Sequence, residues 1–202
     1  MPGSITLLWT QIAGWLRQFA PLTFDKLNSP ADERALAELA SELGTELPPD
    51  LVELLLSING SDHARGVNGI ILLPPGYYMM DSSRIARDTA QRASIWGDAW
   101  RPTWIAFGND LCGGCLVLDT QRQPPYGRIF EFDEVEGPFG SAWDSLNDLL
   151  TEMLALLEGR GVGLAHRIPY DYPRAPDPLK AVIHNGELEW ERGIAADHGG
   201  DR

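Results

Sequence analysis

The chain has 202 residues, with 29 acidic and 16 basic side chains, so its formal charge at pH 7 is −13. Such a negative field repels phosphate backbones and anionic lipid, which argues against binding to nucleic acid or to a membrane surface. No apolar run approaches the roughly 20 residues of a bilayer-spanning helix, and residues 1–4 show no export signal, so we expect a cytoplasmic protein.

Three helices are predicted in the first 60 residues. Residues 5–19 repeat apolar side chains at helical spacing, which gives one inward-facing stripe. Residues 29–32, Ser-Pro-Ala-Asp, have the composition of a helix start, and Gly44 stands where a left-handed residue ends a helix. Residues 48–49 are two prolines that open a third helix, which we expect to end at Asn59-Gly60.

The hydrophobic period changes in the middle of the chain. Residues 67–73 are apolar and β-branched, which predicts a strand, and residues 82–93 predict a short helix. The apolar runs 104–107 and 115–118 are too short for helices and flank a segment rich in Gly, Asn and Asp, so they predict an antiparallel hairpin. Residues 127–133, GRIFEFD, alternate as a strand whose two phenylalanines face a core.

A last amphipathic helix is predicted before residue 159. Ser141 and Asp144 form a capping pair ahead of a leucine-rich repeat at helical spacing, and Gly159 closes it. Helices, then mostly antiparallel strands, then a helix indicate an α+β fold rather than alternating βαβ units. We expect this domain to occupy residues 1–158.

The remaining residues, 159–202, are rich in glycine and proline and form a predicted extension. Within it, Asn185-Gly186 separates two alternating runs, which is a strong signal for a β-hairpin over residues 181–190. We expect the hairpin to lie against the sheet and residues 195–202 to be frayed.

The chain's two cysteines, Cys112 and Cys115, have the C-x-x-C spacing of redox and metal sites. A redox cysteine lies at a helix N-terminus that stabilises its thiolate, whereas Cys115 leads into a predicted strand. Structural zinc needs four ligands, and the four histidines are scattered. We therefore predict no metal and no cofactor, and interpret Gly113-Gly114 as a turn; a thiol-redox or metal function is the lesser alternative.

Other catalytic patterns are missing from the sequence. A glycine run at residues 159–163 follows a helix instead of a strand, so it is not a dinucleotide fingerprint, and there is no P-loop, no nucleophile elbow and no H-E-x-x-H. We assign no catalytic residues and predict that the protein is not an enzyme.

Two segments carry candidate contacts for a protein partner. FEFDEVEG concentrates four acids within residues 131–136, which form either a docking surface for a basic partner or a charged sheet edge that prevents aggregation. Trp96 and Trp100 lie in the loop-like stretch SIWGDAWRP, where they are either exposed anchors or a cover for the edge of the sheet.

Together these segments resemble a known family. SPADERALAELASELGTELPPDLVELLLSINGSD resembles the opening of the SUKH superfamily, named for a yeast cell-wall-assembly regulator and its bacterial relatives, with its "LG..LP" break at residues 43–48 and its Asn59-Gly60 end. RPTWIAFGNDLCGGCLVLDT is similar to the family's central hairpin, whose second strand ends here at Asp119. GRIFEF and SAWDSLNDLLTEML look like the closing strand and helix, so the resemblance covers about residues 5–158.

The resemblance implies a non-enzymatic, protein-binding domain without catalytic residues. Many bacterial members look like immunity proteins that bind and neutralise a cognate toxin, often a nuclease, whereas eukaryotic members are regulatory or scaffolding proteins. We therefore expect a toxin domain, such as a basic nuclease, as partner, and keep a scaffold with several partners as the alternative. The candidate contacts are Trp96, Trp100, Asp110, Glu131, Asp133, Glu134 and Glu136.

Overall fold

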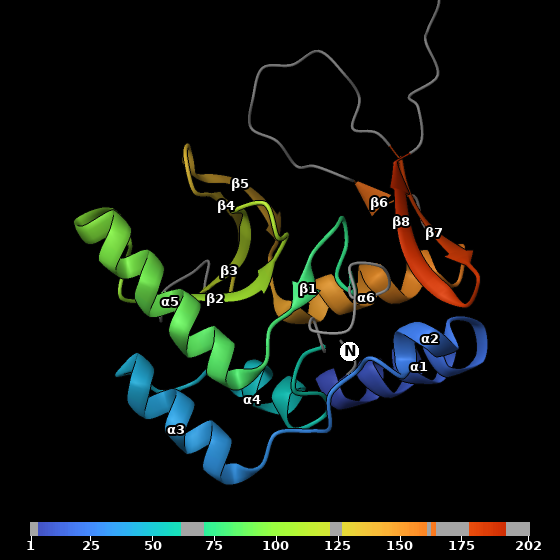
Figure 1. The fold of residues 1–202 in the computed structure, drawn as a ribbon, viewed down its shortest axis with the longest axis horizontal. Helices are drawn as coiled ribbons and strands as arrows, with labels where there is room; N and C mark the ends of the chain where they lie inside the picture. The colour runs from blue at the N-terminus through green and yellow to red at the C-terminus, as the bar shows by residue number, and fades with distance from the viewer. Residues whose placement is uncertain (1–3, 62–70, 122–126, 161–162, 165–177, 193–202) are drawn as a thin grey trace, which may run out of the picture.

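The computed structural model of the chain describes residues 4–61, 71–121, 127–160, 163–164 and 178–192. Within these residues, strands β1 to β5 form an antiparallel sheet in chain order, and β6 to β8 form a second, three-stranded sheet. The fold is therefore α+β, as predicted (Figure 1). The elements are α1 (Ile5–Phe19), α2 (Pro21–Phe24), α3 (Glu33–Leu43), α4 (Pro49–Leu55), β1 (Tyr78–Met79), α5 (Ser82–Trp96), the 3-10 turn η1 (Gly97–Ala99), β2 (Trp104–Asn109), β3 (Cys115–Asp119), β4 (Ile129–Asp133), β5 (Gly137–Trp143), α6 (Leu146–Leu157), β6 (Gly163–Leu164), β7 (Pro178–His184) and β8 (Glu187–Arg192).

The three predicted N-terminal helices form as α1, α3 and α4, but some of their boundaries differ. The predicted end of the third helix at Asn59-Gly60 is wrong, because α4 ends at Leu55. The predicted start of α3 at Ser29 is wrong, because Asp32 is the capping residue and its carboxylate accepts a hydrogen bond from Ala35 N at 2.8 Å. The preceding segment is held extended, since Ala31 N donates to Leu55 O at 2.9 Å. Phe19, the last residue of the expected apolar stripe of α1, is 47 % exposed and packs beside Trp15.

The predicted strand over residues 67–73 is wrong where the structure describes it. Residues 71–73 contain only an isolated bridge from Leu73 to Tyr77, residues 67–70 lie outside the described residues, and the strand of this region is β1. The predicted helix over 82–93 continues to Trp96, and Asp81 caps its start by accepting from Arg84 N at 2.9 Å.

The predicted hairpin of β2 and β3 forms the middle of the sheet. Consecutive residues Cys115–Leu118 of β3 are all buried, so both faces of this strand are covered. β1 pairs only with the last residues of β2, and beyond it α5 covers the open edge of β2: Ala106 N donates to Thr89 Oγ1 at 3.1 Å. This bond satisfies a backbone group that would otherwise be an unpaired strand edge.

Strand β4 lies inside the sheet, between β3 and β5, rather than at its edge. The expected charged sheet edge is therefore wrong, and FEFDEVEG instead forms β4 and the turn into β5. Phe130 and Phe132 pack edge-on against tryptophans, as the predicted aromatic face requires. The opposite face is buried too, because Ile129 is 0 % and Glu131 only 7 % exposed.

The residue that caps α6 lies four residues after Ser141, the predicted cap. Ser141 lies in β5, and the cap is Ser145, whose hydroxyl accepts from Asp148 N at 3.1 Å. Trp143 ends β5 and its indole donates to Glu152 on α6 at 2.7 Å. The predicted apolar face of α6 is buried in the same core as the sheet and α1. No helix among the described residues is long and apolar enough to cross a membrane.

The predicted hairpin over residues 181–190 is present as β7 and β8. Asn185 and Gly186 have φ values of 52° and 83°, the left-handed pair that a two-residue turn of type I′ requires. The hairpin packs on α2 and α6 and not on the five-stranded sheet, so the predicted position is wrong (Figure 1). Residues 195–202, expected to be frayed, lie outside the described residues.

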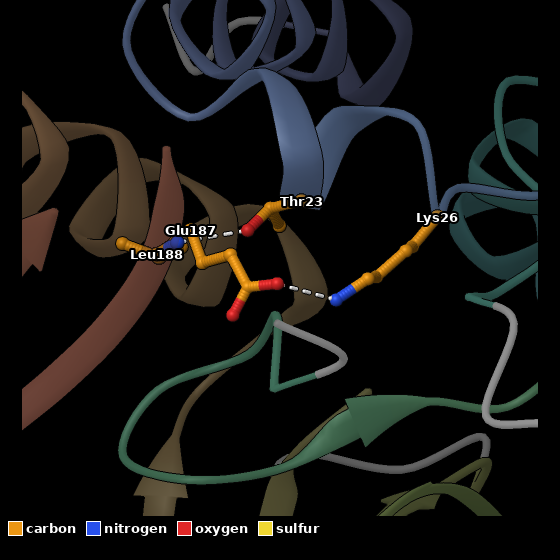
Figure 2. Close-up of polar contacts among 4 residues, drawn as sticks. All are labelled: Thr23, Lys26, Glu187 and Leu188. Atoms are coloured by element: carbon orange, nitrogen blue, oxygen red, sulfur yellow. Dashed lines mark hydrogen bonds and ion pairs between the residues drawn. The ribbon is translucent and has the colours of Figure 1, made fainter. Parts of the chain in front are cut away.

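The hairpin is held by polar contacts as well as by packing. Leu188 N donates to Thr23 Oγ1 at 2.8 Å, and Lys26 Nζ lies 2.7 Å from Glu187 Oε1 (Figure 2). Thr23 and Leu188 are each only 1 % exposed, so their hydrogen bond is shielded from water. The indole of Trp190 donates to Leu72 O at 3.3 Å, which ties β8 to the segment before β1.

Substitution of Thr23 by Val is expected to destabilise the fold by about 1–3 kcal/mol, because the buried Leu188 N–H loses its acceptor. Thr23→Ser keeps the hydroxyl and is the matched control. Urea unfolding gives the free energies, and hydrogen exchange reports the Leu188 amide. Equal stability of the Val variant with an unchanged exchange rate at Leu188 would contradict this role of Thr23.

Candidate functional site

The turn between β2 and β3 is fixed by two side chains that accept hydrogen bonds from its own backbone. Asp110 Oδ1 accepts from Cys112 N and from Gly114 N, both at 2.8 Å, and Asn109 Oδ1 accepts from Leu111 N at 2.8 Å. The predicted turn is confirmed. Asp110, a candidate partner contact, is half-buried and shapes the turn itself.

The two cysteines of this turn have different environments. Cys112 is exposed, Cys115 is buried, and both are free thiols. Burial raises the pKa of the Cys115 thiol to about 12, the opposite of the low pKa that an attacking thiolate needs. Among the described residues, no group of three His, Cys, Asp or Glu side chains is arranged to hold a metal ion.

A cleft of about 450 Å³ opens between α5, the β2–β3 turn and the β4–β5 turn. Seven large hydrophobic side chains are exposed among the described residues, and three of them line this cleft. They are Ile95 (68 % exposed), Leu111 (48 %) and Val135 (81 %), one from each of the three segments, and we call them the apolar rim. Exposed apolar side chains gathered around one cleft are typical of a surface that binds another molecule.

Leu111 has an unusual backbone for its residue type. Its φ is 66°, and Asn185 is the other non-glycine residue with positive φ in the described part of the chain. Asparagine tolerates this left-handed region, but a bulky leucine pays a steric penalty of about 1–2 kcal/mol there. Strained backbone of this kind is concentrated at functional sites. Here the strained residue is an exposed leucine at the tip of the turn.

The inner wall of the cleft combines an aromatic ring with charged groups. Trp96 lines it and packs edge-on against Phe132, with ring centroids 5.0 Å apart. Arg92 is only 8 % exposed and donates from Nη1 to Gly113 O at 3.1 Å. One turn earlier on α5, Asp88 Oδ2 accepts from the Asn109 side-chain amide at 3.0 Å. These contacts connect α5 to the β2–β3 turn.

The structure separates the sequence-predicted contacts. Trp96 and Glu134 line the cleft, and Glu136 is exposed in the neighbouring β4–β5 turn. Asp133 shapes that turn, because its Oδ1 accepts from Val135 N at 2.7 Å and from Glu136 N at 2.9 Å. The remaining two candidates, Trp100 and Glu131, are 5 % and 7 % exposed.

Trp100 and Trp96 do not lie in an exposed loop. Trp96 ends α5, and Trp100 follows η1 and packs edge-on against Trp104, with centroids 5.5 Å apart. Both cover the aromatic face of the sheet, which favours the covering role over the exposed-anchor role for Trp100.

Sequence reasoning missed the apolar rim and Arg92. A signal existed for two of these residues: Leu111 and Val135 are single apolar residues inside turns that are otherwise built from Asn, Asp, Glu and Gly. An apolar residue at the tip of a turn gains nothing from the core. Ile95 and Arg92 carry no such signal, because helical spacing alone does not show which side of α5 is covered.

A second, larger hollow of about 610 Å³ lies between residues 45–50 and the start of α6. None of the exposed large hydrophobic side chains of the described residues lines it; the three leucines that do, Leu47, Leu118 and Leu146, are core residues. Size alone therefore does not make it the better candidate for a binding surface.

In the folded protein at pH 8, iodoacetamide is expected to alkylate Cys112 and to leave Cys115 unmodified until the chain unfolds. The pKa of the Cys115 thiol is raised to about 12 in the folded chain, whereas that of an unfolded cysteine is about 8.5. Between these two pKa values, unfolding therefore releases a proton from Cys115. Stability should therefore fall as the pH rises between them, less so in Cys115→Ala. Mass spectrometry counts the adducts. Equal alkylation rates of both native cysteines would contradict the burial argument and revive the redox alternative.

Comparison with known proteins provides the remaining information. A search of curated proteins finds no match to the chain. A family model, that of the SMI1 / KNR4 family (SUKH-1), matches residues 30–152, which extend from just before α3 into the first half of α6 and include every segment that forms the cleft. Because this match covers more than half of the chain, the protein belongs to the SMI1 / KNR4 family (SUKH-1).

Proposed function

We propose that the chain is a cytoplasmic immunity protein: a non-enzymatic domain that binds a cognate bacterial toxin and blocks its activity. Family membership supports a protein-binding role, since SUKH domains typically bind protein partners. The immunity role rests on the resemblance of many bacterial SUKH members to toxin-neutralising proteins. Binding alone is sufficient for this function.

The observation that carries the proposal is the apolar rim around the cleft. Burying a Val, Leu or Ile side chain contributes about 1.5–3 kcal/mol when it is fully removed from water. Three such residues lie on separate segments, one on α5 and two in turns held by Asp110 and Asp133, and offer a preorganised contact surface. Protein interfaces concentrate their binding energy in small clusters of this kind.

The charge around the rim favours a basic partner. Glu134 and Glu136 are exposed beside Val135 in the β4–β5 turn, and the chain as a whole carries a formal charge of −13. Charges at the border of an interface mainly accelerate association and weaken with added salt, whereas the buried apolar contacts set the lifetime of the complex. A basic nuclease domain is a partner of this chemistry.

We also propose that the binding domain comprises residues 1–158 and that the extension supports it. The hairpin of β7 and β8 packs on α2 and α6, while the cleft is built by α5 and the turns before β3 and β5. The alternative function is a regulatory scaffold with several partners, which would use the same surface. A thiol-redox function has no support from the buried Cys115.

Val135→Asp is expected to weaken toxin binding at least 10-fold, because a charge replaces an apolar side chain of the rim; this corresponds to about 1.4 kcal/mol. Leu7→Asp is the matched control, since Leu7 is an exposed side chain (54 %) on α1 outside the cleft. The assay combines growth rescue and calorimetry with the toxin domain encoded by the neighbouring gene. Failure of the wild-type chain to bind the toxin or to restore growth contradicts the immunity function, and full protection by Val135→Asp contradicts the site.

Leu111→Gly is expected to weaken binding without lowering stability. Glycine adopts a φ of 66° without strain, which offsets its greater freedom in the unfolded chain, so stability should be unchanged or rise by up to about 1 kcal/mol. The same substitution removes a rim side chain and should weaken toxin binding at least 10-fold. Urea unfolding and calorimetry measure the two effects. A variant that is both more stable and equally tight in binding would show that Leu111 has no role in recognition.

A further inference from the structure

The cleft contains a buried arginine whose charge is not neutralised by an ion pair within the described residues. Arg92 is 8 % exposed, and its one hydrogen bond to a described residue goes to a carbonyl, Gly113 O. Its Nε atom is buried and has no hydrogen-bond partner among the described residues. Burying a cation without an ion-pair partner lowers the stability of a fold. The position of the Arg92 guanidinium in a cleft therefore indicates an anionic ligand that would pair with it.

The carboxylates that line the cleft, those of Asp88 and Glu134, form no ion pair with Arg92. Asp88 is engaged by the Asn109 amide at 3.0 Å. Glu134 crosses over Gly113, where a glycine leaves room for its carboxylate, and it belongs to the exposed β4–β5 turn. A second guanidinium, that of Arg84, also lines the cleft and lies over the Tyr78 ring, 5.6 Å from its centroid. Two cations therefore line the cleft from α5, together with Asp88, whose carboxylate is engaged by Asn109. The exposed acid of the cleft, Glu134, lies on the outer turn.

We propose, building on the proposed function, that the partner inserts an aspartate or glutamate side chain that pairs with Arg92, while apolar residues beside it contact the rim. The guanidinium fork matches a carboxylate, and their charge-assisted hydrogen bonds strengthen when water is excluded. The apolar rim supplies that exclusion. Glu134 and the overall charge repel any anion that enters the cleft. A partner carboxylate is accompanied by apolar side chains that gain contacts with the rim and offset this repulsion, whereas a free phosphate gains none.

This assignment changes the expected chemistry of the partner. The acidic turn and the net charge attract a basic protein from a distance, whereas the buried contact selects an acidic tip on that protein's binding loop. Long-range steering and short-range recognition then depend on opposite charges, and added salt should slow association without abolishing the Arg92 contact.

The test that does not depend on a known partner is a selection of displayed, disulfide-constrained random loops on the full-length chain, with counter-selection on Val135→Asp. The enriched loops should carry Asp or Glu next to apolar residues, and Asp→Asn or Glu→Gln in the loop should weaken binding at least 10-fold. Enrichment of Lys or Arg in place of the acid, no effect of the amide substitution, or no enrichment over Val135→Asp would overturn the proposal.

Variants of the chain give the complementary measurement. Arg92→Gln should weaken the selected acidic loops at least 10-fold and remove the difference between an acidic loop and its amide form. Arg87→Gln, at an exposed arginine of the same helix outside the cleft, is the control. The amide-substituted loop tests the same contact without altering the fold, so an Arg92→Gln variant that unfolds leaves the answer intact.

The toxin domain encoded by the neighbouring gene separates this inference from the proposed function. If Val135→Asp releases that toxin domain but a folded Arg92→Gln variant binds it as tightly as the wild type, the immunity function stands and the role of Arg92 is wrong. If the wild-type chain does not bind the toxin domain but binds acidic loops through Arg92, the proposed partner is wrong and the recognition chemistry stands.

Discussion

The two backbone hydrogen bonds that Asp110 accepts, from Cys112 and Gly114, hold the turn on which the cleft depends. They fix the position of Gly113, whose carbonyl receives the Arg92 guanidinium from α5. Leu111 lies between Asp110 and the two residues that Asp110 binds, and the chain on both sides continues into β2 and β3. These constraints hold Leu111 at its positive φ. One short polar side chain thereby connects the sheet, the helix and the apolar rim.

A second set of contacts stabilises the opposite part of the molecule. Helices α1 and α2 and the hairpin of β7 and β8 all lie outside residues 30–152, which match the family model. They nevertheless contact each other, through Thr23 and Leu188 and through Lys26 and Glu187 (Figure 2). The two ends of the described chain therefore contact each other beside α6, remote in sequence from the turns that form the cleft.

Sequence patterns predicted those elements whose structure is decided locally. The Asn185-Gly186 turn, the apolar repeat of α6 and the β2–β3 hairpin all follow from neighbouring residues, and all are confirmed. Strand β5 was not predicted, because Gly137 and Pro138 are unfavourable in strands, and its pairing with β4 is a long-range interaction. Without β5, β4 was assigned to an edge, so Glu131 was expected to be exposed, whereas it is buried.

The same distinction explains the candidate site. Glu134 and Trp96 were chosen for their chemistry and do line the cleft, yet the rim that surrounds them consists of residues from three segments brought together by folding. The exposure of Ile95 and the burial of Arg92 depend on how α5 lies against the β2–β3 turn. Helical periodicity locates the face of α5 toward the core but contains no information about that neighbour.

Hydrogen exchange of the full chain with and without its bound toxin domain is the most direct measurement of where the partner lies. The account predicts slower exchange upon binding in residues 91–96, 110–114 and 133–137, with residues 178–192 unchanged. Protection confined to the β7–β8 hairpin and α2, with the two turns unaffected, would contradict it.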